Sequence, residues 1–95
     1  MNDRVSEERL DHYFAVTGEA LEKVREAPRG DEKQAEDFLD MASRYYADAK
    51  HFRQQGEWVL AFAALNYAHG WLDAGARIGL FKVYDSRLFT VDEKE

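Results

Sequence analysis

The sequence predicts an all-α protein, a three-helix up-and-down antiparallel bundle with a C-terminal tail folded back on it. Apolar residues recur at three- and four-residue steps along most of the chain, which is the period of an amphipathic helix. Two short breaks, at residues 28–30 and at Gly56, divide this pattern into three segments. The 95 residues, of which 45% are hydrophobic, are enough for one small core. We therefore predict a single helical-bundle domain over residues 1–95.

The first helix is predicted at about residues 6–27. Ser6 is a candidate N-cap, and the two glutamates after it place negative charge where the helix dipole favours it. Pro28, the only proline, interrupts the pattern and ends the helix. The apolar face of this helix consists of Leu10, Tyr13, Phe14, Thr17, Ala20, Leu21 and Val24.

The second helix is predicted at about residues 31–55. Asp31 and Gln34 have the spacing of a capping box, and Gly56 suits the left-handed position that follows a helix. The apolar stripe of this helix consists of Ala35, Phe38, Leu39, Ala42, Tyr45, Tyr46, Ala49 and Phe52. A third helix, at about residues 57–79, begins almost at once, so the two helices must form an antiparallel hairpin.

The third helix is exceptionally apolar, because residues 58–68 contain a single polar side chain, that of Asn66. A surface helix normally has a polar face. We therefore expect the tail or a second molecule to cover this helix. A small monomer would have difficulty hiding so much apolar surface, which favours a C2 homodimer. The candidate interface residues are Trp58, Leu60 and Phe62.

The tail, residues 80–95, is too apolar over residues 80–91 to be a disordered segment. We expect those residues to fold back on the bundle, with one helical turn near residues 85–88. The last four residues are expected to fray.

The composition excludes several classes of protein. A net charge of -6 disfavours nucleic acid as the main partner, because coating nucleic acid requires a basic face. There is no cysteine, hence no disulfide framework and no thiolate metal site. There is also no run of about 18 apolar residues that would predict a membrane span. The charged N-terminus lacks the apolar core of a signal peptide. We expect a soluble, cytoplasmic protein with no membrane partner.

One polar cluster could carry chemistry, since Asn66, His69 and Asp73 share a face of the third helix. A histidine and a carboxylate at this spacing can bind a metal, act as an acid–base pair or simply hydrogen-bond. The simplest interpretation is a satisfied buried cluster that pairs with helix two, for example with Tyr45 or Asp48. A zinc site would need a third ligand, for which Asp48 is the candidate. We assign no catalytic residue, metal or cofactor.

Residues 45–49 (YYADA), Phe52, Gly56 and the string YAHGWLDAG at residues 67–75 resemble an archaeal family known as "domain of unknown function 357". The resemblance covers half to two thirds of the chain. It implies a small up-and-down helical bundle in an archaeal cytoplasm. It implies no activity, because none is assigned to the family.

A weaker similarity is to HEPN-type helical domains. HEPN ribonucleases use an arginine and a histidine, completed across a dimer, and Arg44 and His51 have a similar spacing. Any helix can produce that spacing, so it is weak evidence for RNA binding or cleavage.

These observations favour a non-enzymatic domain for protein–protein interaction or self-association, with a homodimer or another protein as its partner. One alternative is a small-molecule or metal site at His69 and Asp73. The other is HEPN-like binding or cleavage of RNA.

Overall fold

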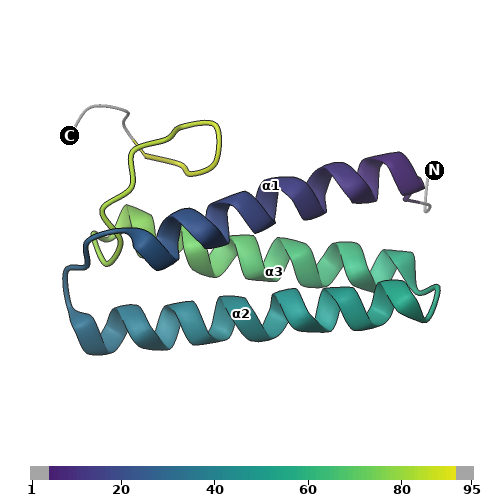
Figure 1. Ribbon diagram of the computed structural model, residues 1–95, viewed down its shortest axis with the longest axis horizontal. Helices are drawn as coiled ribbons and strands as arrows, with labels where there is room; N and C mark the ends of the chain where they lie inside the picture. Colours follow the sequence, from purple (N-terminus) through teal and green to yellow (C-terminus); the bar gives the residue numbers. More distant parts are fainter. Residues whose placement is uncertain (1–4, 92–95) are drawn as a thin grey trace.

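The computed structural model describes residues 5–91 and contains three helices, α1 (Glu7–Glu26), α2 (Glu32–Gln54) and α3 (Trp58–Arg77). Successive helices run in opposite directions, and Figure 1 shows α3 between α1 and α2, with the tail looping back beside α1. The predicted all-α three-helix bundle with a folded-back tail is confirmed. Each helix begins and ends within two residues of its predicted bound.

Side-chain caps mark the N-terminal ends of α1 and α2, and a glycine follows the C-terminal end of α2. The Ser6 hydroxyl accepts a hydrogen bond from the Arg9 amide at 3.1 Å, and the Asp31 carboxylate accepts one from the Gln34 amide at 2.9 Å. Each bond satisfies an amide that has no partner inside the helix. Gly56 has a φ of 78°, the left-handed conformation that a glycine adopts without steric cost.

The α2–α3 hairpin packs closely because small side chains line its inner faces. Ala42 and Ala49 of α2, and Ala61 and Ala68 of α3, have no exposed surface. Helix α1 packs on the same hairpin, and its contact with α3 is more extensive than its contact with α2. The largest side chains with less than 2% exposure are those of Leu10, Val24, Leu65, Leu72 and Phe81. Helix α3 is the central helix of the bundle, because its contacts with α1 and with α2 are each more extensive than the contact between α1 and α2.

The tail covers the end of the bundle where α1 meets α2. Phe81 is 1% exposed, and its ring occupies the space that a Cβ atom on Gly75 would fill. Backbone hydrogen bonds from Gly30 to Leu80 at 3.0 Å and from Lys82 to Pro28 at 2.9 Å join the tail to the α1–α2 link.

The tail also contains the predicted turn. The amides of Leu88 and Phe89 both donate to the Asp85 carbonyl at 3.0 Å, and both side chains are buried. Residues 92–95, for which fraying was predicted, lie outside the described part of the chain. Among the described residues, no helix is both long enough and apolar enough to cross a membrane.

Candidate functional site

The outward face of α3 carries an uncharged stripe. We call this set the outer stripe: Val59, Leu60, Ala63, Asn66, Tyr67, Gly70 and Ala74. At about 100° of rotation per residue, these seven positions fall within an arc of about 120°. All of them are exposed, and the three largest apolar ones, Val59, Leu60 and Tyr67, are 55%, 47% and 63% exposed. The stripe lies opposite the buried face of α3 and leaves a large apolar surface without an internal partner.

Aromatic contacts with the neighbouring helices form the two edges of the outer stripe. On the α2 side the rings of Tyr45 and Tyr67 stack with their centroids 5.0 Å apart. On the α1 side the Tyr13 ring meets the Phe62 ring edge-on, also at 5.0 Å. These contacts pack the bordering rings against the neighbouring helices.

A shallow apolar depression of about 400 Å³ lies in the middle of the outer stripe, lined by Asn66, Tyr67, Gly70 and Trp71. A Cβ atom added to Gly70 would meet no atom of the described chain within 4 Å, and the backbone there does not have a positive φ. Neither internal packing nor backbone conformation therefore requires glycine at position 70.

Only one of the three predicted interface residues belongs to the outer stripe. Leu60 is exposed, whereas Trp58 and Phe62 are half-buried and pack against a core cluster of their own chain that includes Leu65. Val59, Ala63, Tyr67 and Gly70 are also exposed on this face, although they were not among the predicted interface residues. A helical projection of α3 would have placed them on the face opposite its most apolar residues.

The structure places His69 at a junction of three elements. Its Nδ1 atom lies 3.1 Å from the Thr17 Oγ1 atom of α1, and its Nε2 atom lies 2.6 Å from the Leu88 carbonyl oxygen of the tail. One neutral tautomer satisfies both contacts: Nε2–H donates to Leu88, and Nδ1 accepts from the hydroxyl of Thr17. Asp73, one turn further along α3, accepts a hydrogen bond from the amide of Thr90. His69 and Asp73 thus tie the tail to α3.

The expectation that this cluster pairs with helix two is wrong. The partners of His69 and Asp73 lie on α1 and the tail, which approach this edge of α3 where α2 does not. Asn66 is exposed in the outer stripe, Tyr45 packs on Tyr67, and Asp48 is exposed on α2, so the structure does not bring these three to His69. Within residues 5–91, no group of three or more His, Cys, Asp or Glu side chains is placed to hold a metal ion.

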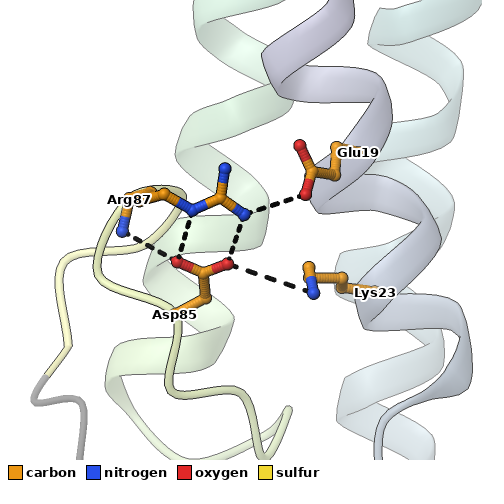
Figure 2. Close-up of polar contacts among 4 residues, drawn as sticks. All are labelled: Glu19, Lys23, Asp85 and Arg87. Carbon is orange, nitrogen blue, oxygen red and sulfur yellow. Dashed lines mark hydrogen bonds and ion pairs between the residues drawn. The ribbon is translucent and has the colours of Figure 1, made fainter.

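A second polar network joins the tail to α1 (Figure 2). The Arg87 guanidinium donates to both carboxylate oxygens of Asp85, at 3.2 and 2.8 Å, and to Glu19 of α1 at 3.0 Å. Lys23 lies 4.0 Å from the same aspartate. The hydrogen bonds from Arg87, followed by the charges of Arg87 and Lys23, hold the pKa of the Asp85 carboxyl below its ordinary value. This network is solvent-exposed and positions the tail.

The arginine and histidine of the HEPN-like hypothesis lie on the exposed side of α2. Arg44 donates from Nε to Asp40 at 2.9 Å, and His51 is exposed in the last turn of the helix. Both residues belong to one helix and lie outside the outer stripe, and their surroundings on α2 include acidic side chains such as Asp48.

Comparison with known proteins identifies a family for this chain but no activity. The model of the family described as "Protein of unknown function (DUF357)" matches residues 12–81, which include most of α1 and all of α2 and α3. No curated protein and no solved structure matches the chain. The match spans well over half of the 95 residues. The chain therefore belongs to the DUF357 family of proteins of unknown function.

Proposed function

We propose that this domain is a non-enzymatic self-association module, and that two copies of the chain meet through the outer stripe of α3. One observation supports the proposal: from Val59 to Ala74 the outward face of α3 has no charged side chain, although the molecule is otherwise highly charged, and the exposed Arg77 lies at the end of this face. Of all residues, 34% are charged, yet none of these lies among the seven members of the stripe. Apolar surface of this kind is a typical sign of an interface.

The net charge of the chain restricts the surfaces through which a second copy can bind. Each chain carries a net charge of -6, so two copies repel each other wherever charged faces meet. The outer stripe lets them approach with no charged side chain in the centre of the contact. An isologous C2 contact then buries the same apolar face on both subunits.

The dimensions of the stripe predict weak binding. Helix α3 has 20 residues and is therefore about 30 Å long. A strip of this length and about 10 Å wide offers roughly 300 Å² per subunit, against about 800 Å² in a standard stable interface. Tyr45 and Trp71 add apolar area at the edge of the stripe. We expect a weak, reversible dimer, because this area is smaller than that of a standard stable interface.

Sedimentation equilibrium from micromolar to millimolar concentration tests this proposal. Ala63→Glu places a charge in the stripe at an exposed helical position where glutamate is a good helix former. Ala15→Glu, at an exposed position of α1, is the matched control with the same change in composition and charge. We expect the parent and Ala15→Glu to dimerise and Ala63→Glu to stay monomeric with an unchanged helical spectrum. A parent that is monomeric at every concentration would refute the proposal.

The polar contacts of His69 argue against the alternative of a small-molecule or metal site. Both of its ring nitrogens lie within hydrogen-bond distance of atoms of the same chain, and Asp73 accepts a hydrogen bond from the Thr90 amide of the tail. Nor do Arg44 and His51 favour RNA cleavage, because Arg44 is paired with Asp40 and both residues lie outside the outer stripe. The proposed function is therefore based on the outer stripe.

The acidic, cysteine-free composition and the family membership support a further expectation about location. We propose that the protein works in the cytoplasm of an archaeal cell. Immunodetection in fractionated cells tests this location, and recovery in the membrane or extracellular fraction would contradict it.

A further inference from the structure

Building on the proposed self-association, we infer that the two α3 helices pack antiparallel, with the Tyr67 ring of each protomer seated over Gly70 of the partner subunit. Three features of α3 support this arrangement: the unexplained glycine, the order of large and small side chains along the outer stripe, and the charges at the two ends of the helix.

Gly70 differs from the other glycines inside helices. A Cβ atom on Gly18 would lie 2.8 Å from the Tyr46 Oη atom, and one on Gly75 would collide with the Phe81 ring, so both are explained by a neighbour in the same chain. Gly70 has no such neighbour, although glycine weakens a helix relative to alanine. Glycine on a helix surface permits close approach of another group, and here that group must come from outside the described chain.

The order of large and small side chains along the stripe is complementary to the same order read in the opposite direction. If Tyr67 lies opposite Gly70 of the partner subunit, symmetry places Gly70 opposite Tyr67 of the partner subunit. The same alignment places Ala63 opposite Ala74 of the partner subunit. The two largest rings then fill the two depressions at the glycines, and small side chains face each other on either side, which lets the helices approach closely.

A parallel arrangement lacks this complementarity, because it would place Tyr67 against Tyr67 of the partner subunit and would leave both depressions empty. The end charges favour the antiparallel arrangement as well. Glu57 precedes α3 and makes no side-chain capping hydrogen bond, and Arg77 at the other end uses Nη1 to bind the Thr90 carbonyl, with further donors remaining. Antiparallel packing brings each glutamate near an arginine and opposes the helix dipoles, whereas parallel packing would bring like charges together.

Cysteine cross-linking decides the orientation cleanly, because the chain contains no cysteine. The single variants Ala63→Cys and Ala74→Cys are first shown by sedimentation to dimerise like the parent. They are then treated with a short bis-maleimide, separately and as an equimolar mixture. We expect the mixture to yield a cross-linked dimer containing one copy of each variant, and each variant alone to yield little. Efficient linking of Ala63→Cys to itself would establish parallel packing and overturn the inference.

The contact between Tyr67 and Gly70 of the partner subunit is tested by exchanging the large and the small side chain. Tyr67→Ala and Gly70→Tyr are each expected to raise the dissociation constant of the dimer by about tenfold or more. The double variant Tyr67→Ala/Gly70→Tyr puts a ring opposite a small residue again and is expected to recover most of the lost affinity. If the double variant is as weak as the worse single one, the assignment is wrong. A dimer that forms without any mixed cross-link would overturn the inference and leave self-association intact, whereas a monomeric parent would overturn both.

Discussion

Alanine substitutions of Gly70 and Gly75, made one at a time, are expected to change the stability of the monomer in opposite directions. The two glycines lie five residues apart in α3, and the substitution is the same in both cases. In each, alanine should gain about 0.8–1.0 kcal/mol of helix propensity. The difference comes from the space around the new methyl group, so the pair measures packing with local propensity held constant.

At Gly70 the methyl group enters open space, since apart from the two chain neighbours and the nearby backbone of the same helix no atom of the described chain lies within 4 Å of the added Cβ. The full propensity gain of about 1 kcal/mol should therefore appear, which corresponds to a rise in melting temperature of about 4–8 °C for a domain of this size. At Gly75 the methyl group collides with the ring of Phe81, which is 1% exposed and has no room to move. Overpacking of this kind costs about 1–3 kcal/mol and outweighs the propensity gain.

Urea titration followed by circular dichroism measures both variants, at concentrations low enough to keep the chain monomeric. We expect the free energy of unfolding to rise for Gly70→Ala and to fall for Gly75→Ala, with about 2 kcal/mol between them. If Gly70→Ala destabilises the monomer by as much as Gly75→Ala does, position 70 is packed against its own chain. An external group would then not be needed to explain the glycine at this position.

Three further predictions concern the tail and the dimer. His69→Ala should lower the free energy of unfolding by about 1–3 kcal/mol because it leaves the buried Thr17 hydroxyl and the Leu88 carbonyl without their partner. An unchanged urea midpoint would show that these two contacts do not stabilise the fold. The Asp85 carboxyl has a lowered pKa in the folded protein, so its stabilising effect is present at neutral pH and is lost as the pH falls below about 4, through the folded pKa. Arg87→Ala should accordingly be less stable than the parent at pH 7 and approach it in acid, and an equal deficit at both pH values in urea titrations would contradict this cause. Because each subunit carries a charge of -6, added sodium chloride should strengthen the dimer in sedimentation experiments by screening repulsion; dissociation by salt would instead indicate an interface held by ion pairs.

The helices were predictable because their signals are local. Ser6 and Asp31 cap the helices that their positions predict, and Gly56 takes the left-handed conformation expected between α2 and α3. A cap contacts an amide three residues away, so the sequence around it contains both partners. The 3.6-residue period likewise identifies the apolar face of each helix without reference to any other helix.

The candidate site was predicted less well, because its residues depend on contacts far apart in sequence. His69 was recognised as a polar residue in need of a partner, but its partners are 52 residues before it and 19 residues after it. Trp58 and Phe62 were expected at the interface, yet core packing half-buries both of them. Nothing local distinguishes a large apolar side chain that faces its own core from one that faces outward on an almost wholly apolar helix.

By itself, the sequence determined that this protein is an all-α bundle of three helices, where those helices begin and end, and that α3 is too apolar for an ordinary surface helix. The tertiary structure decided which face of α3 stays exposed. Helices α1 and α2 and the tail cover the sides that bear His69 and Trp71, and they leave Val59, Tyr67 and Gly70 uncovered. The physical reason is that exposure depends on which elements pack around a helix, whereas helix formation depends mainly on the residues within it and at its ends.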